Sequence, residues 1–284
     1  MTLLKGETDG SSLVDQARNL IADVSNKTIR KKKCNRRKLV VSRTLKKVNV
    51  NVGILRLQRL FWLCQDAFRG PGTVPSPVHV NRLCHILDIM KPEDVGLIRD
   101  LHFFKTKREQ KTNARVVYTT IYKCQNFSLC IFFLPEGAVI PLHNHPGMTV
   151  FSKLLLGTMH IKSYDWVDPT ASESSRSLSR LRLARLKANR IFEAPCDTSV
   201  LYPTSGGNIH EFRAITPCAV LDVIGPPYSK EDGRDCSYYK DSPCDAPLEG
   251  KESDNRYAWL EEIEMPSDSE MDVIEYLGPS VSLT

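Results

Sequence analysis

The chain has 284 residues, of which 41% are hydrophobic and 25% are charged, and its formal net charge is +6. This balance is ordinary for a soluble globular protein of one large domain or two small ones. Nine cysteines without a C-x-x-C pair or a regular spacing argue against a secreted disulfide framework, and no apolar stretch resembles a signal peptide or a membrane span. We therefore expect a protein of the reducing cytosol or nucleus that does not act at a membrane.

Residues 1–54 form a polar segment that is poor in aromatic residues. Such a segment cannot bury enough apolar surface to offset its ordering entropy, so we expect a mostly disordered arm. Two basic clusters lie between Arg30 and Lys38, and three interpretations stay open: a nuclear localisation signal, a nucleic-acid contact or a solvated tail. Because no aromatic residues interleave with these charges, we expect no direct contact with nucleic acid.

Residues 55–284 are predicted to form the folded domain, which begins with two amphipathic helices. Apolar residues recur at helical spacing over 57–68, and again over 80–90, with the Gly- and Pro-rich segment 70–77 between them. Pro92 is typical of the first turn of another short helix. We expect these helices to cover one end of a β-rich domain.

Strand signals dominate the rest of the chain. The segments 115–122 and 127–134 are rich in β-branched and aromatic residues and predict a hairpin, because Gln125-Asn126 between them favours a turn. Residues 168–189 interrupt the pattern, and we interpret them as an insertion in a surface loop whose second half could form a basic helix. Further strands are expected at these segments: 159–165, 196–202, 209–215 and 219–224. The acidic C-terminal part is expected to pack back as strand around 259–260 and 273–276.

A pair of histidines is the first candidate for chemistry. Gly137 is followed by His143-Asn144-His145, and Gly157 lies twelve residues after the second histidine. Side chains alternate along an extended strand, so His143 and His145 project from the same face. This is how a β-scaffold offers two imidazoles to one metal ion.

The spacing of these glycines and histidines resembles the first motif of the cupin superfamily, whose members are small β-barrels related to jelly rolls. The resemblance implies a mainly β fold, a cupin-type double-stranded β-helix with a few N-terminal helices. Most cupins carry a Glu ligand where this chain has Thr149 or Val150. A third ligand must come from elsewhere, and His210 after a Gly-rich turn is the best candidate.

Three neutral imidazoles without a carboxylate leave a divalent ion at its full +2 charge and favour an anionic ligand such as a thiolate. The segment 141–166, together with GGNIHEF, LDVIGPPY and GRDCSYY further on, resembles the plant cysteine oxidases, relatives of 2-aminoethanethiol dioxygenase. This resemblance runs from about residue 55 to the C-terminus. It implies that His143, His145 and His210 bind iron(II), Fe²⁺.

The resemblance also implies a substrate and a biological role. The expected reaction adds both atoms of O2 to the N-terminal cysteine of target proteins and gives the sulfinic acid. In the family, this oxidation marks transcription factors that begin Met-Cys for the N-degron pathway, so the protein would act in oxygen sensing and the hypoxia response. We expect a monomer that works in the nucleus and cytoplasm.

Four other residues are candidates for the active site. Asp222 stands in the apolar strand AVLDVIG, where a buried carboxylate is costly unless it is paired. It is interpreted either as a structural residue, in an ion pair or at a strand end, or as the group that holds the substrate ammonium or orients a water. Cys236 and Tyr238 match the position of a Cys–Tyr thioether crosslink in the animal relatives, with plain packing as the alternative. Tyr228 is expected at the pocket mouth.

Other functions remain open at this point. Imidazole ligands suit zinc, nickel and copper as well as iron, so a zinc or nickel cupin without oxygenase activity is one alternative. Free cysteine or cysteamine is the alternative substrate within the dioxygenase class. A nuclear binding protein that relies on its basic arm would not need the three histidines.

Overall fold

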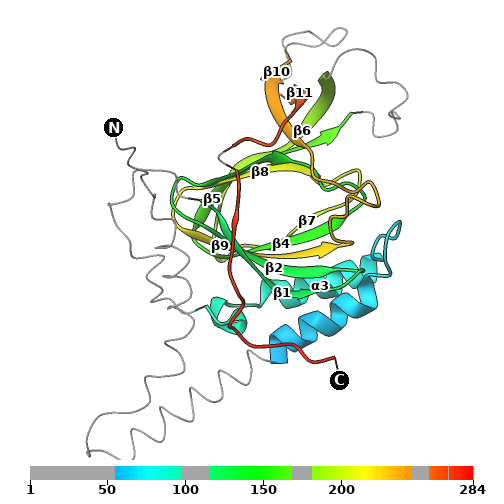
Figure 1. Ribbon diagram of the computed structural model, residues 1–284, viewed down its shortest axis with the longest axis vertical. Coiled ribbons are helices and arrows are strands. Elements are labelled where there is room, and N and C mark those ends of the chain that lie inside the picture. Colours follow the sequence, from blue (N-terminus) through cyan, green and yellow to red (C-terminus); the bar gives the residue numbers. More distant parts are fainter. Residues whose placement is uncertain (1–54, 98–114, 168–180, 245–255, 268, 284) are drawn as a thin grey trace, which may run out of the picture.

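A computed structural model describes residues 55–97, 115–167, 181–244, 256–267 and 269–283 (Figure 1). Two β-sheets face each other, and helices lie against the outer surface of one of them. In the other sheet, strands β6, β10 and β11 extend away from the first sheet. The predicted mainly β, jelly-roll-like architecture is confirmed. The predicted disorder of 1–54 lies outside the described residues.

The helices form where the sequence predicts them. One covers residues 55–67, α3 covers Pro77–Asp88, and a 3-10 helix covers Pro92–Val95. The hydroxyl of Ser76 caps α3 by accepting a hydrogen bond from the backbone N–H of His79. These helices cover the face of a sheet and not one end of the barrel as expected, because their buried side chains pack on that sheet.

The sheet that the helices cover has the strand order β12-β1-β2-β9-β4-β7. The predicted hairpin is β1 paired with β2, and β9 lies between β2 and β4 with both of its edges occupied. All eight residues of β9 are buried, which explains its nearly continuous apolar sequence. The strand bounds are β1 Val117–Lys123, β2 Ser128–Leu134, β4 Thr149–Leu156, β7 Ser199–Leu201, β9 Cys218–Gly225 and β12 Asp272–Val273.

The second sheet closes on itself in the order β10-β11-β6-β5-β8-β3, because β10 pairs with both β11 and β3. Half of it, namely β3, β8 and β5, faces the first sheet. The other half, β6, β11 and β10, curls away, and a small core that includes Tyr164, Ala184 and Leu260 lies between the two halves. The bounds are β3 Val139–His143, β5 Thr158–Trp166, β6 Leu181–Glu193, β8 Ile209–Ala214, β10 Tyr238–Pro243 and β11 Tyr257–Ile263.

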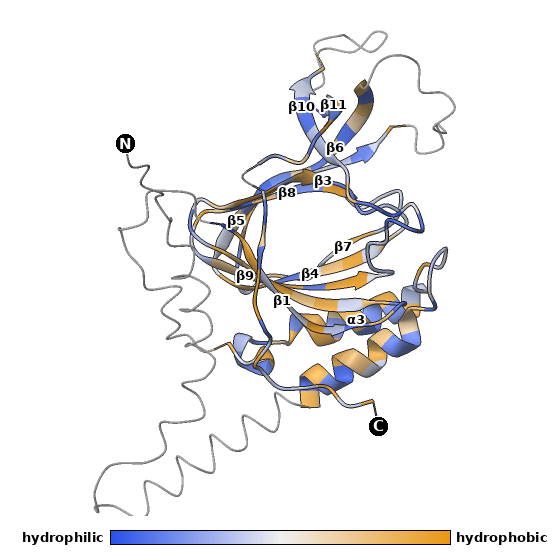
Figure 2. Cartoon of the chain, viewed as in Figure 1, coloured by the Kyte–Doolittle hydropathy of each residue, from blue (hydrophilic) through white to orange (hydrophobic). Residues whose placement is uncertain are grey.

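Two larger apolar cores hold these layers together. One lies between the helices and the first sheet and includes Phe61, Phe127 and Phe151, all fully buried. The other fills one end of the space between the sheets, where Ile161 and Phe212 meet Val220. Full burial of one such side chain contributes about 1.5–3 kcal/mol. The first sheet is largely orange in Figure 2, whereas the helices alternate between blue and orange, as elements with a single apolar face do.

The interpretation of residues 168–189 as a surface insertion with a basic helix is wrong for its second half. Leu181–Glu193 is a strand of 13 residues that pairs with β5 on one edge and with β11 on the other. Two occupied edges supply backbone hydrogen bonds that override the helix propensity of its Leu, Ala, Arg and Lys residues. Residues 168–180 lie outside the described part of the chain.

The C-terminal segment packs back on the domain, as predicted. β11 lies in the closed sheet, and β12 pairs in parallel with β1. The chain then runs down to the helices, where Ser282 exchanges two hydrogen bonds with the side chain of Gln58 (Figure 1). Within the described ranges, no helix is both long and apolar enough to span a bilayer.

Candidate metal centre

Three histidines converge in the space between the two sheets. His143 is the last residue of β3, and it is paired across the ladder with His210 on β8. His145 lies in the turn that follows β3, not on an extended strand as the sequence reasoning assumed. The ring centroids nevertheless form a nearly equilateral triangle, with separations of 4.9 Å for His143 to His145, 4.8 Å for His143 to His210, and 4.9 Å for His145 to His210.

Hydrogen bonds orient each ring. The Nδ1 atom of His143 donates to the carbonyl oxygen of Pro141 at 2.8 Å, and the ring of His210 bonds to the backbone of Gly207. The Tyr228 hydroxyl donates to the carbonyl oxygen of Asn144, so His145 Nδ1 donates its proton to the phenol oxygen, 2.8 Å away. Such partners fix the tautomer of a metal-binding histidine.

The protein keeps these imidazoles neutral. Burial lowers the pKa of His143, and it lowers the pKa values of His145 and His210 well below the usual value, with the neighbouring histidines adding to the effect. Neutral imidazole is the form that binds a metal ion.

The arrangement fits a metal ion. The ligand atoms of the three histidines lie within 4.8 Å of one another, a spacing that one ion can bridge. His145 Nε2 is buried and lacks a hydrogen-bond partner in the described part of the chain, which is costly for a protein without an ion at this point. Among the described residues, this candidate metal group includes no carboxylate.

A polar wall faces the histidines from the first sheet. Asp222 on β9 is paired with Cys130 on β2 and Ser152 on β4, and it shares its strand face with Val220, a member of the core between the sheets. Asp222 is 5% exposed and its carboxyl group interacts with the Ser152 side chain, while its Oδ1 atom has no partner among the described residues. Burial raises the pKa of Asp222 to about 7, against the opposing effect of the Ser152 hydrogen bond.

The other predicted residues, Tyr228, Cys236 and Tyr238, lie next to the three histidines. Tyr238 is the cross-strand partner of His143, and their ring centroids are 6.4 Å apart. Burial raises the pKa of the Cys236 thiol to about 11, and the side chains of Tyr228 and Tyr238 partly oppose this rise. Burial likewise raises the pKa of Tyr228 well above its usual value. All seven predicted site residues therefore gather in one region, and their roles stay predictions.

Sequence reasoning missed several residues that support this region. Asn144 accepts a hydrogen bond from the backbone of Ser237 and donates to the hydroxyl of Tyr239, so it joins the histidine turn to β10. Asp165 and Asn208 hold the loop before His210. The pair Gly206-Gly207 signalled a tight loop there, but nothing in the sequence connected Asp165 with it.

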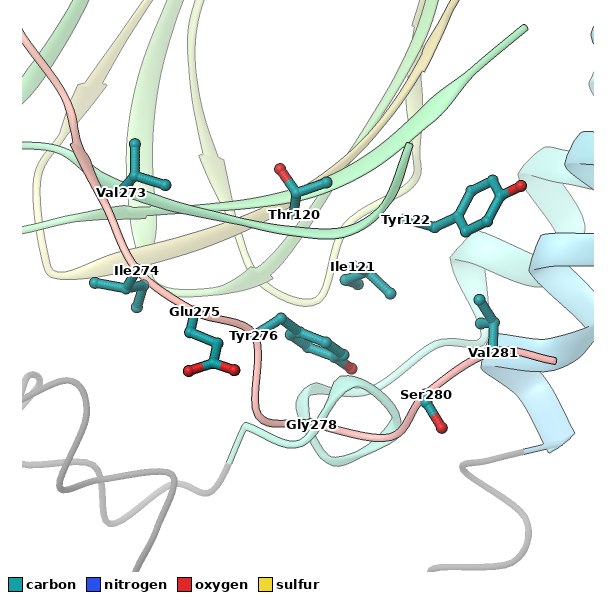
Figure 3. Close-up of a pocket in the computed structure, with 10 residues that line it drawn as sticks. All are labelled: Thr120, Ile121, Tyr122, Val273, Ile274, Glu275, Tyr276, Gly278, Ser280 and Val281. Carbon is teal, nitrogen blue, oxygen red and sulfur yellow. The ribbon is translucent and has the colours of Figure 1, made fainter. Parts of the chain in front are cut away.

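A groove elsewhere on the molecule is separate from the triad. It has a volume of about 480 Å³ and lies between β1 and the C-terminal segment, next to the helices (Figure 3). Ile121, Tyr276 and Val281 contribute apolar side chains to it, and none of the three histidines lines it.

The sequence of this chain is similar to that of several known proteins. The family model described as PCO_ADO matches residues 86–281. Plant cysteine oxidase 2 of Arabidopsis thaliana is 46% identical over 264 residues, which is 90% of this chain and 92% of that protein. The 2-aminoethanethiol dioxygenase of Homo sapiens is 32% identical over 76% of this chain and 87% of its own. A solved RmlC-like cupin protein from Desulfovibrio desulfuricans is 19% identical, with a TM-score of 0.28, over 43% of this chain and 92% of that one.

Proposed function

Because the chain belongs to the family of plant cysteine oxidases and 2-aminoethanethiol dioxygenases, we propose that it is an iron(II)-dependent thiol dioxygenase. Its proposed substrate is the N-terminal cysteine of other proteins, which it converts to cysteine sulfinic acid with O2. The observation that carries this proposal is the convergence of three neutral histidines on one point, in a candidate group that includes no carboxylate among the described residues.

The charge of this ligand set explains the preference for a thiol. His143, His145 and His210 would hold the iron, which supplies the redox chemistry that couples a thiol to O2. Neutral imidazoles cancel none of its +2 charge, so the site favours an anionic sulfur ligand over a neutral one. The buried position of all three rings, at 3–8% exposure, keeps bulk water from competing strongly for the same positions.

Asp222 gives the pocket a means of recognising the α-ammonium group of an N-terminal cysteine. Its side chain shares a strand face with Val220 in the core between the sheets, and one oxygen of its carboxylate has no partner among the described residues. An ammonium placed there pairs with the carboxylate and lowers its pKa, which favours the ionised form. Asp222 therefore orients the cysteine, while the histidines hold the metal.

The proposed reaction needs no further reductant. Both oxygen atoms of O2 end on the substrate sulfur, the thiol proton remains with the sulfinic acid or passes to solvent, and the sulfur supplies all of the electrons that O2 takes up. Burial raises the pKa of Tyr228 well above its usual value, so its hydroxyl stays protonated at neutral pH and orients the His145 ring through their hydrogen bond.

The proposed biological role is oxygen sensing. Oxidation of target proteins that begin Met-Cys, after removal of the methionine, would feed an N-degron pathway, and low O2 would stabilise those targets in the hypoxia response. The basic segment between Arg30 and Lys38 supports action in the nucleus as well as in the cytoplasm.

A small thiol is the second candidate substrate, because one relative is by name a 2-aminoethanethiol dioxygenase. The two candidates are separated by comparing kcat/KM for free cysteine, for 2-aminoethanethiol and for a peptide that begins with cysteine. We expect the peptide to be preferred. A preference for a free thiol would assign the protein to the small-thiol class.

The main test joins metal analysis with mass spectrometry. Purified protein is analysed for bound metals and is incubated in air with a peptide that begins with cysteine. We expect iron, together with addition of two oxygen atoms to the peptide. A different metal with an unchanged peptide would support a zinc or nickel cupin, and the absence of any metal would support a binding protein.

A further inference from the structure

The side chain of Asn208 connects two of the three candidate metal ligands. Asn208 lies in the loop before β8, two residues from His210. Its Oδ1 atom accepts a hydrogen bond from the backbone N–H of His145 at 3.0 Å, and its Nδ2 atom donates to the His145 carbonyl oxygen at 2.9 Å. The same amide also donates to the carbonyl oxygen of Tyr202 at 2.8 Å. This buried side chain thus reproduces, for His145, the pair of hydrogen bonds that a neighbouring strand would supply.

Asp165 on β5 holds the loop that carries Asn208. Its Oδ2 atom accepts from the backbone N–H of Gly206 at 3.0 Å, and its Oδ1 atom accepts from those of Gly207 at 2.8 Å and Asn208 at 3.1 Å. Both glycines have positive φ, 83° and 84°, which lets three successive N–H groups point at one carboxylate. Asp165 is only 6% exposed, so these charge-assisted bonds form away from water.

His145 needs support from these side chains because it lies outside the strand pairing that fixes the other two histidines. His143 and His210 are fixed relative to each other by the ladder between β3 and β8. His145 lies two residues beyond the end of β3, and the ladder between those strands does not reach it. Its ring is held by Tyr228, and its backbone is held by Asn208 and by a turn bond from the N–H of Met148.

We infer that Asn208 is a positioning residue for the metal centre, which fixes the backbone of His145 relative to His210, and that Asp165 sets the loop from which it acts. This inference rests on the proposed metal site. Neither side chain belongs to the candidate metal group, so their effect would be on metal affinity and on ligand geometry. Loss of a partner that orients a metal ligand typically weakens metal binding about 10- to 100-fold.

The test uses Co²⁺ as a spectroscopic probe of the metal site in the full-length protein. Metal-free wild type, Asn208→Ala and Asn189→Ala are titrated with Co²⁺, and the visible absorption bands and the dissociation constant are recorded. Asn189 is the matched control, because it also pairs with a histidine, His160, at 2.7 Å, but on the exposed side of β5 and β6. Thermal unfolding of each metal-free protein is measured in parallel.

We expect Asn208→Ala to raise the dissociation constant at least about 10-fold and to shift the absorption bands, while Asn189→Ala stays within about 2-fold of wild type. A folded Asn208→Ala protein with wild-type affinity and spectrum would overturn the inference. So would equal losses in both variants. If wild type itself binds no Co²⁺, the proposed metal site fails and the inference fails with it, whereas intact wild-type binding with unaffected variants overturns the inference alone.

If Asn208→Ala does not fold, Asn208→Asp and Asp165→Asn take its place. Asn208→Asp keeps the acceptor for the His145 N–H and loses both donated bonds. Asp165→Asn can still accept from two of its three N–H partners. We expect either milder variant to weaken Co²⁺ binding by about 10-fold, and wild-type binding by both would overturn the inference.

Discussion

His143 and His210 face each other across the antiparallel pair of β3 and β8, with ring centroids 4.8 Å apart and ring planes at 74°. Directly opposed residues on neighbouring strands are the closest side-chain neighbours that a sheet provides. The backbone ladder therefore sets the distance between two of the three candidate ligands before any metal binds. Phe212 stacks on the His210 ring at 4.5 Å and limits its rotation.

The first prediction concerns this pair. His210→Ala removes one of three neutral ligands, and the remaining two cannot retain iron through purification. We expect metal content, measured by inductively coupled plasma mass spectrometry, to fall from near one ion per chain to a small fraction, with loss of oxygen addition to the cysteine peptide. His160→Ala is the control, since His160 lies on the outer side of β5 and pairs with Asn189. Equal metal content in both variants would contradict the assignment.

The second prediction concerns the stability of the metal-free protein. The pKa of an Asp carboxyl in the unfolded chain is about 3.9, and burial raises the pKa of Asp222 to about 7 in the folded protein. The folded state thus retains a proton that the unfolded state releases, so the free energy of unfolding falls as pH rises through this window. The full decrease is about 4 kcal/mol. The variant Asp222→Asn should abolish this pH-dependent decrease.

Urea unfolding of metal-free wild type and Asp222→Asn at about pH 4.5 and pH 8 measures this effect. The two proteins should differ little at the lower pH, and the variant should be more stable at the higher one. With metal restored, we expect Asp222→Asn to retain iron and to lose much of the turnover, because it cannot pair with the substrate ammonium. An equal pH dependence in both proteins would show that Asp222 is not buried as a proton-binding group.

Much of the fold was predictable because local pattern and tertiary environment agree. The helix over 55–67 and the hairpin of β1 and β2 carry their own periodicity and turn signals, so each could be read without knowledge of its neighbours. β6 could not, because its residues are mostly exposed helix formers and only its two paired edges make it a strand. A strand specified by its neighbours leaves a weak signal in its own sequence.

In the candidate site, too, some residues carry a local sequence signal and others are placed only by the tertiary structure. The histidines could be predicted because metal binding demands a specific residue type at a specific spacing. Asp165 could not be connected with Gly206, since the two lie 41 positions apart and only strand pairing brings them together. The position of His145 beyond the strand end also escaped the alternation argument, although the rings still converge.

The third prediction tests the hydroxyl of Tyr228. Tyr228→Phe keeps the ring but leaves His145 Nδ1 and the Asn144 carbonyl oxygen without their partner. We expect the free energy of unfolding to fall by about 1–3 kcal/mol and metal affinity to fall about 10-fold. Tyr276→Phe is the control, because that hydroxyl bonds to the Val95 carbonyl oxygen in the C-terminal segment. A loss of metal affinity as large in the control would show that the effect is general destabilisation.

The fourth prediction compares two glycines with the same backbone requirement and different surroundings. Gly207 and Gly233 both have positive φ, 84° and 67°, so a Cβ at either position costs about 1–2 kcal/mol in backbone strain. At Gly233 the new atom meets nothing within 4 Å, but at Gly207 it would lie 2.5 Å from Ser163 Oγ and 2.8 Å from Ser163 Cβ.

Because Ser163 is buried on β5 directly opposite His210, it cannot move aside without shifting the strand that supports a candidate ligand. Gly207→Ala should therefore cost about 1–3 kcal/mol more than Gly233→Ala, from overpacking added to strain. It should also lower the affinity for Co²⁺, whereas Gly233→Ala should not. Chemical denaturation and metal titration of the two variants side by side measure both effects. Equal stability with equal affinity would mean that the loop before His210 yields freely, and that its shape does not govern the metal site.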